Sequence, residues 1–281
     1  MDVVHLSSAD EMLTVTGDAL RRTGAEGELT LGILWRLTHE PDAWGADVTL
    51  LAGVEGGTPV AVVTMTGPHP ALIVGLGDDP GVDYAGFVEA MAAGPRPVGV
   101  NGAVRWVDPF ARAWSEAGAT TTLHREMRAF ELLAVKPPRT PDGTFRPAGS
   151  ADGELMERWV TAFGDDVGEQ VTAEQAHNTV YRLTSSRDLW VWERDGEVVS
   201  MAAITRRTPW SSTVALVYTP PQQRGQGYAS AVVAQLSQRE LDAGQEWCAL
   251  FTDVANPTSN HIYAEIGYEP RCDFHHYVLE W

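Results

Sequence analysis

The sequence predicts an α/β protein built from two copies of one domain, each a mixed central sheet flanked by helices. Strand patterns alternate with amphipathic helix patterns along the 281 residues. Segments of the first half match segments of the second half in the same order, as expected for a repeat. Three prolines within residues 136–143 exclude a helix or a central strand there. We therefore place one domain at 1–135, a linker at 136–143 and a second domain at 144–281.

The first half contains a hairpin, three further strands and two helices. Strand patterns at 47–52 and 59–66 flank Glu55-Gly56-Gly57, which is typical of a tight turn. The remaining elements are expected in this order: a strand at 70–75, a helix at 84–93, a strand at 97–100, a helix at 108–118 and a strand at 124–134.

The second half begins with a strand at 144–148 and two helices. Ser150 or Asp152 can cap the first helix, which carries apolar residues up to Phe163. The later elements are expected in this order: a helix at 173–183, strands at 189–193, 197–206 and 214–218, a helix after Gly227, a strand at 247–251, a helix from Pro257 to Gly267 and a strand at 276–281.

The composition restricts the classes of partner. The chain has 38 acidic and 20 basic residues and a formal net charge of -18, which disfavours nucleic acid and anionic lipid. Two cysteines form neither a disulfide framework nor a metal cluster, so we expect no metal and a reducing compartment. The first residues lack a signal layout, and no apolar run reaches the roughly 20 residues of a membrane span. We therefore expect a cytoplasmic protein.

The most informative stretch is 211–244, in which a strand, a Pro-Pro turn and a glycine-containing loop lead into a helix. Gly225 and Gly227 allow a ligand to approach the backbone N–H groups closely. The start of the helix adds unpaired N–H groups and partial positive charge, and Arg224 adds a cation. These features predict a site for a phosphate or diphosphate.

Two common phosphate-binding motifs do not fit this loop. It has no lysine for a Walker A sequence, and Ser230 stands where a dinucleotide fingerprint has its third glycine. A second polar motif lies downstream, where Asn256 can cap a helix whose first residue is Pro257. Asn256 and Tyr263 recur at helical spacing with Ser259 and Asn260, so they line one face of that helix.

The two motifs together resemble those of the GNAT-type N-acetyltransferases. Arg224, Gly227 and Ala229 fit the Q/R-x-x-G-x-G/A acyl-CoA signature of that family, and Asn256 and Tyr263 fit its downstream motif. The resemblance implies acetyl-CoA as co-substrate, contact between Asn256 and the pantetheine arm, and Tyr263 as the general acid that protonates the departing thiolate. It also implies that the backbone of Val217, Tyr218 and Thr219 binds the pantetheine. The diphosphate is expected to contact the residues of the loop and the helix start, which are Arg224, Gly225, Gln226, Gly227, Tyr228, Ala229 and Ser230.

The corresponding residues of the first half differ in chemistry. Tyr84-Ala85 aligns with Tyr228-Ala229, but Asp83 takes the place of Gly227. The other differences are Pro80 opposite Arg224, Val107 opposite Asn256, Trp114 opposite Tyr263, and the additional acidic residues Asp78 and Asp79. A diphosphate would be repelled there, so the chain resembles tandem GNAT proteins with one degenerate half.

The predicted reaction is direct transfer of an acetyl group from acetyl-CoA to a primary amine, in a ternary complex. The general base remains open, because the strand before the loop contains no carboxylate. Asp253 and Glu193 are weak candidates, and the carboxylates of Asp165, Asp166 and Glu169 could bind a cationic amine or be solvated. The alternatives are a non-catalytic acyl-CoA sensor or scaffold, and transfer from longer or aminoacyl donors. The acceptor is a small molecule whose identity stays open, as does the choice between a monomer and a homodimer.

Overall fold

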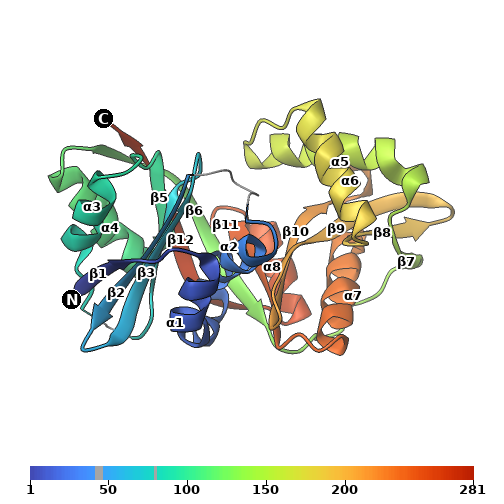
Figure 1. The fold of residues 1–281 in the computed structure, drawn as a ribbon. Coiled ribbons are helices and arrows are strands. Elements are labelled where there is room, and N and C mark those ends of the chain that lie inside the picture. Colours follow the sequence, from blue (N-terminus) through green and yellow to red (C-terminus); the bar gives the residue numbers. More distant parts are fainter. Residues whose placement is uncertain (42–46, 79–80) are drawn as a thin grey trace. The chain divides into compact units, whose positions relative to one another are not determined.

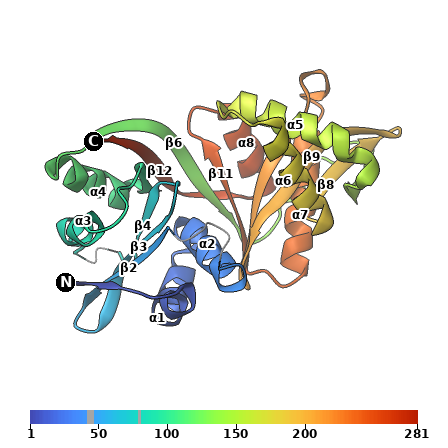
Figure 2. The same ribbon diagram turned by 45° about the horizontal axis from the view of Figure 1, so that its top comes forward.

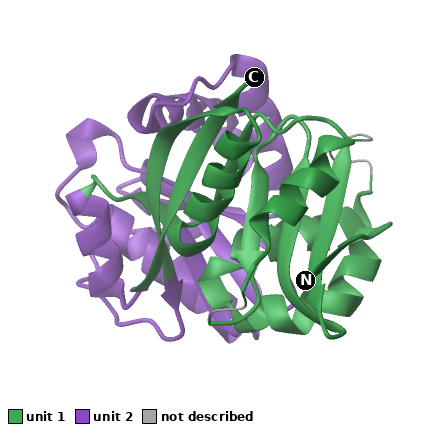
Figure 3. Ribbon diagram, turned by 90° about the vertical axis from the view of Figure 1, so that its left-hand side faces the viewer, with its two compact units in different colours: residues 1–130, 251–256, 270–281 green, residues 131–250, 257–269 purple. Residues whose placement is uncertain are grey.

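The computed structural model describes residues 1–41, 47–78 and 81–281. The chain forms two compact units, shown in different colours in Figure 3. Unit 1 contains Met1–Phe130, Phe251–Asn256 and Pro270–Trp281, and unit 2 contains Glu131–Leu250 and Pro257–Glu269.

Unit 1 has a mixed sheet with helices on both faces. Its strand order is β1-β2-β3-β4-β5-β12-β6, in which β4 and β5 are parallel. Figure 1 shows α1 and α2 on one side of these strands and α3 and α4 on the other. The elements are β1 (Asp2–His5), α1 (Ala9–Arg22), α2 (Glu28–His39), β2 (Val48–Glu55), β3 (Thr58–Thr66), β4 (Ala71–Gly75), α3 (Tyr84–Ala92), β5 (Gly99–Ala103), α4 (Val104–Glu116), β6 (Thr120–Leu132) and β12 (Glu269–Glu280).

Unit 2 repeats this plan with the strand order β11-β10-β9-β8-β7, in which β10 and β11 are parallel. Helices α5 and α6 lie on one side of the strands and α7 on the other (Figure 1). The elements are β7 (Thr144–Pro147), α5 (Gly153–Val167), α6 (Ala173–Ser185), β8 (Leu189–Arg194), β9 (Glu197–Arg207), β10 (Ser211–Tyr218), α7 (Tyr228–Asp242), β11 (Trp247–Asp253) and α8 (Pro257–Ile266).

The element order of the first half recurs in the second, which confirms the predicted tandem α/β architecture. The series strand, two helices, three strands, helix, strand, helix, strand runs from β1 to β6 and again from β7 to β12. The compact units do not follow the predicted boundaries at 1–135 and 144–281, because nearly all of β12 lies in unit 1. There β12 pairs with β5 in antiparallel register from Phe274↔Ala103 to Val278↔Gly99.

Close backbone packing accompanies this pairing of β12. A Cβ atom on Gly99 would lie 2.4 Å from the carbonyl oxygen of Tyr277, so only glycine fits at that point of β5. The end of β12 is fixed by aromatic contacts, because the ring of Trp281 lies edge-on to Trp114 of α4 at 5.4 Å. Figure 2 shows the C terminus, in dark red, next to α4. The last strand of the chain therefore completes the sheet of unit 1.

Several predicted elements need correction. Strand β1 and helices α1 and α2 were not predicted, and the predicted start of β5 was two residues early. Helix α4 begins at Val104, four residues before the predicted start, with Pro109 inside it. The buried side chains of Trp106 and Val107 account for this extra turn, because they add apolar packing that offsets the hydrogen bond lost at proline.

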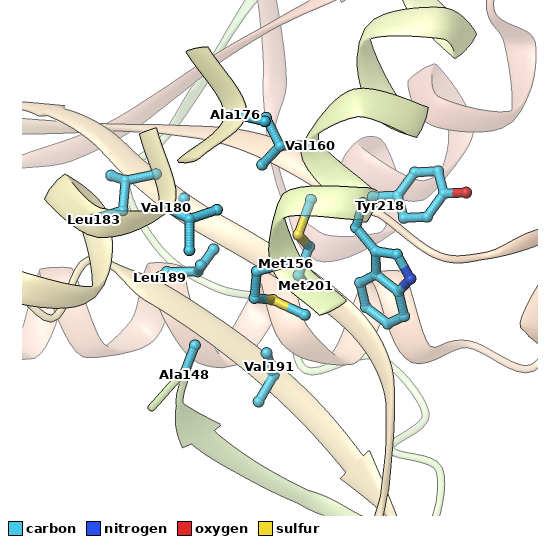
Figure 4. Packing of buried hydrophobic residues seen from close by; sticks show 12 residues of the cluster. Ala148, Met156, Val160, Ala176, Val180, Leu183, Leu189, Val191, Met201 and Tyr218 are labelled. Atoms are coloured by element: carbon cyan, nitrogen blue, oxygen red, sulfur yellow. The ribbon is translucent and has the colours of Figure 1, made fainter. Parts of the chain in front are cut away.

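The core of unit 2 lies between α5, α6 and the sheet. Figure 4 shows this cluster, in which Met156 and Val180 from the helices pack against Val191 and Met201 from the strands. Tyr218, the last residue of β10, belongs to the same cluster, so the core fixes the point where β10 ends. Among the described residues, no helix has the length and apolar character that a membrane crossing requires.

Candidate functional site

The last residues of β10 lack regular strand partners. The parallel register with β11 runs only from Ser211↔Trp247 to Thr213↔Ala249, although β10 continues to Tyr218. The register with β9 shifts between Ala215 and Tyr218, and Leu216 has φ 51°, an unusual conformation for leucine. In the described registers, Leu216 and Val217 pair with neither strand. This bulge leaves the backbone of Val217 able to pair with an extended ligand.

The next two residues are held by side chains. The hydroxyl of Ser200 donates a hydrogen bond of 3.2 Å to the carbonyl oxygen of Tyr218 and lies 2.9 Å from the hydroxyl of Thr219. The buried ring of Tyr218 packs against Trp159 with 5.6 Å between the ring centroids. Of the three predicted pantetheine contacts, Val217 thus lies in the bulge, whereas Tyr218 and Thr219 are both held by Ser200.

The loop after β10 has the open geometry that the glycines predict. Gly225 and Gly227 have φ 76° and 83°, in the left-handed region where glycine is favoured. A Cβ atom on Gly225 would have no other heavy atom within 4 Å, so one side of the loop faces open space. Both glycines are exposed, as is Gln226 between them.

Helix α7 starts directly after this loop without a side-chain cap. Its N-cap is Gly227, and the first backbone bond within the helix joins the N–H of Ala231 to the carbonyl oxygen of Gly227 at 3.0 Å. The N–H groups of Tyr228, Ala229 and Ser230 therefore lie at a helix start that no capping side chain occupies. Together with the helix dipole, they favour an anion.

Arg224 is partly neutralised by a carboxylate. Its Nη2 lies 2.6 Å from Oδ2 of Asp166 at the end of α5, and its Nε donates to the carbonyl oxygen of Thr219 at 2.9 Å. Both side chains of the ion pair are about half exposed, at 49% and 50%. Asp166 was expected to be solvated or to bind an amine, so its pairing with Arg224 corrects that expectation.

Tyr228 connects the loop to the hairpin between β8 and β9. Its side chain is buried, and its hydroxyl donates to Oε1 of Gln226 at 3.1 Å. Nη1 of Arg194 donates to the hydroxyl of Tyr228 at 2.7 Å and to Oε1 of Gln226 at 3.3 Å. Arg194 follows the strand predicted at 189–193, and no sequence pattern indicates that it reaches this loop.

The downstream motif begins as predicted, with Pro257 as the first residue of α8. Tyr263 is buried in this helix, and its ring centroid lies 6.0 Å from that of Tyr268. Burial raises the pKa of Tyr263 to about 12, so its hydroxyl remains protonated at neutral pH. Asn256 lies in the exposed segment just before the helix, where its N–H donates to the carbonyl oxygen of Asp253 at 3.0 Å.

Two carboxylates considered as general bases have other partners. Oδ1 of Asp253 accepts a hydrogen bond of 2.7 Å from the N–H of Ala255, which stabilises the turn before α8. Glu193 accepts a hydrogen bond of 2.7 Å from Nε of Arg146. Within the described ranges, no cluster of His, Cys, Asp or Glu side chains could hold a metal ion.

The matching region of unit 1 is closed. The side chain of Asp83 caps α3 by accepting a hydrogen bond of 3.0 Å from the N–H of Gly86. The ring of Trp106 covers Gly75 at the end of β4, where a Cβ atom would lie 2.5 Å from the indole. Nε1 of Trp106 donates to the buried carboxylate of Glu26, which also binds Arg105. The predicted differences at Pro80 and Asp79 lie outside the described residues.

The comparison with protein families matches residues 154–268 to the acetyltransferase (GNAT) family. The match covers both motifs, from α5 to the residue after Gly267. The chain contains a GNAT acetyltransferase domain. A comparison with curated proteins gave no significant match.

Solved structures show that the GNAT fold extends over both halves of the chain. An acetyltransferase of this family from Colwellia psychrerythraea aligns over 100% of both chains with a TM-score of 0.61 and 11% identity. A GCN5-related N-acetyltransferase from Sphaerobacter thermophilus covers 98% of this chain and 94% of its own, with a TM-score of 0.63 and 14% identity. A tandem GNAT protein from the clavulanic acid biosynthesis pathway covers 98% and 97%, with a TM-score of 0.54 and 12% identity. At these identities the likeness establishes the fold, so both halves of this chain have the GNAT fold.

Proposed function

We propose that unit 2 binds acetyl-CoA and transfers its acetyl group to the primary amine of a small molecule. The observation that carries this proposal is the open start of α7, where glycine stands in place of a capping side chain. Such a helix start is a binding site for phosphate groups. The match of residues 154–268 to an acetyltransferase family supports a diphosphate that belongs to acetyl-CoA.

The carrier would lie along the end of β10 and the loop that follows. The backbone of Val217, Tyr218 and Thr219 would pair with the pantetheine amides, and Asn256 would contact the same arm. The N–H groups from Gly225 to Ser230 would bind the diphosphate, with Arg224 beside them. Asp166 already holds Arg224 at 2.6 Å, so the incoming phosphate would compete with this carboxylate.

Two groups of the chain would assist the transfer itself. An N–H of β10 such as that of Val217 would donate to the thioester oxygen as negative charge develops there, an effect of about 3 kcal/mol per well-placed donor. Tyr263 would protonate the departing CoA thiolate, and its hydroxyl, whose pKa burial raises to about 12, carries a proton at neutral pH. Because β10 contains no carboxylate, the amine would lose its proton to water rather than to a side chain of that strand.

Titration calorimetry with acetyl-CoA, followed by an assay of free thiol release across a panel of amines, tests the proposal. Binding together with amine-dependent thiol release is the expected result. Binding without thiol release from any amine would instead favour an acyl-CoA sensor or scaffold, which the missing carboxylate of β10 also suits. Longer acyl donors belong in the same assay. We further propose that the enzyme works in the cytoplasm as a monomer or a homodimer.

A further inference from the structure

We propose that Arg194 binds the 3′-phosphate of coenzyme A and so lets unit 2 distinguish CoA from dephospho-CoA. This inference rests on the proposed function, because it assumes that the diphosphate of the same ligand occupies the loop before α7. Arg194 is the last residue of β8, in a hairpin that belongs to neither motif of the family resemblance.

The guanidinium of Arg194 is fixed relative to the loop by two hydrogen bonds. Nη1 donates to the hydroxyl of Tyr228 at 2.7 Å and to the amide oxygen of Gln226 at 3.3 Å. Tyr228 is 1% exposed and is the first residue of α7, so its hydroxyl is a rigid anchor. The 3.1 Å hydrogen bond from Tyr228 to Gln226 closes the triangle. Arg194 therefore keeps a set position beside the diphosphate site.

The guanidinium still has donors for a ligand. It has five N–H groups, and the described contacts of Nη2 include no partner. The side chain of Arg194 is 42% exposed. Its Nε lies 3.3 Å from Asp195, whose side chain is 88% exposed, and an ion pair of this kind contributes little in water. A phosphate dianion can replace or share it through two parallel hydrogen bonds.

The two carboxylates that act on Arg194, those of Asp195 and Asp142, are both exposed to water. The hydrogen bond to Tyr228 is the largest cause of a raised pKa of Arg194, and the charges of Asp195 and Asp142 contribute less. Residues 219–230, which form the loop and the first turn of α7, contain no carboxylate. On the other side of the loop, Arg224 is already paired with Asp166. Within the described part of the chain, Arg194 therefore differs from Arg224, because the carboxylates near it are exposed ones.

The chemistry of CoA explains why a second cation is useful. CoA carries a diphosphate and, separately, a phosphate monoester at the 3′ position of its ribose. The loop N–H groups serve the diphosphate, so an arginine anchored to the same loop can recognise the monoester. Arginine suits this role because its planar guanidinium binds phosphate in a bidentate manner.

Calorimetry with CoA and with dephospho-CoA tests the proposal. We expect Arg194→Ala to weaken CoA binding about tenfold and to leave dephospho-CoA binding unchanged, which corresponds to one lost charge-assisted phosphate contact. Tyr228→Phe keeps the ring but removes the anchor, so it should reduce the preference for CoA by about threefold. Arg158→Ala, at an exposed arginine of α5, is the matched control and should change neither affinity.

The outcomes separate this inference from the proposed function. If wild-type protein binds neither ligand, the proposed function fails and the inference fails with it. If it binds both ligands equally, or if Arg194→Ala weakens both by the same factor, acyl-CoA binding stands but Arg194 does not recognise the 3′-phosphate. A circular dichroism melt of each variant identifies any loss that comes from unfolding.

Discussion

The starts of α3 and α7 occupy the same place in the two repeats, yet their chemistry is opposite. Both helices begin with a Tyr-Ala pair, at Tyr84 and Tyr228. Before α3, Asp83 places a carboxylate on the first turn and satisfies the N–H of Gly86. Before α7, Gly227 contributes no side chain. One helix start is closed by its own sequence, and the other is left for an anion.

The strands before these two helices also differ, because the end of β4 is covered and the end of β10 is open. At the end of β4 the indole of Trp106 covers the backbone of Gly75, whereas at the end of β10 the bulge leaves Val217 unpaired in the described registers. Trp106 comes from the extra first turn of α4, which α8 lacks. Two copies of one fold can therefore differ in their capacity for a ligand, because a few side chains fill in one copy the space that is open in the other.

The largest effect is expected when Gly227 of unit 2 is replaced by aspartate, the residue at the matching position 83 of unit 1. Gly227→Asp places a carboxylate at the start of α7, where it would cap the helix and repel a diphosphate. Aspartate tolerates the left-handed conformation of this position better than most residues, so the fold should survive. We expect acetyl-CoA affinity to fall by about 100-fold in calorimetry, since like charges in contact cost several kcal/mol.

The control for this variant is a substitution of Asp83, which occupies the matching position in unit 1. Asp83→Ala should lower the free energy of unfolding by about 1 kcal/mol through loss of the cap, with no change in acetyl-CoA affinity. Undiminished binding by Gly227→Asp, or lost binding by Asp83→Ala, would show that the start of α7 is not the anion site.

The next largest effect is expected at Tyr263. Tyr263→Phe should lower turnover by more than about tenfold and leave acetyl-CoA affinity nearly unchanged, because only proton donation to the thiolate is lost. Steady-state kinetics and calorimetry measure the two quantities. Tyr268→Phe is the matched control, since the hydroxyl of Tyr268 lies 2.8 Å from that of Ser237 and should affect stability but not turnover. Normal turnover in Tyr263→Phe would remove Tyr263 from its proposed role.

A smaller effect, an increase in acetyl-CoA affinity, is expected when Asp166 is changed. Asp166→Asn removes the carboxylate that competes for Arg224, so acetyl-CoA affinity should rise about threefold, the scale of an exposed ion pair. The gain should shrink in high salt. Asp165→Asn serves as the control and should have little effect. Weaker binding in Asp166→Asn would mean that this carboxylate orients Arg224 for the phosphate instead of competing with it.

The pH profile should show no effect of Tyr263 titration in the accessible range. The tyrosine donates only when protonated, and its pKa is raised from 10.0 to about 12, so its protonated form persists well above pH 10. Titration of Tyr263 should therefore add no descending limb to the pH profile of turnover up to pH 10. A descending limb centred near pH 10 would indicate a solvent-exposed tyrosine or another acid.

The sequence predicted the loop and α8 because both depend on local chemistry. Glycines with positive φ, a proline at a helix start and a buried helical face can all be read from neighbouring residues. Helices α1 and α2 were missed, although Ser8 caps α1 by accepting from the N–H of Glu11, a local signal, and the repeat with α5 and α6 also pointed to them.

Other features could not be predicted because they depend on tertiary contacts. The residue pattern of β12 predicts a strand, but it does not indicate that this strand pairs with β5. Asp166 and Arg194 reach the loop from segments 58 and 32 residues away from Arg224 and Gln226. Single charged residues at such distances give no pattern that identifies their partners.

The most direct test of the central claim is the number of acetyl-CoA molecules that one chain binds. Calorimetric titration of the wild-type protein should give one site per chain, and Gly227→Asp should weaken it by about 100-fold, since α7 begins without a side-chain cap whereas Asp83 caps the matching helix α3. Two sites per chain, or one site that Gly227→Asp leaves intact, would contradict the account.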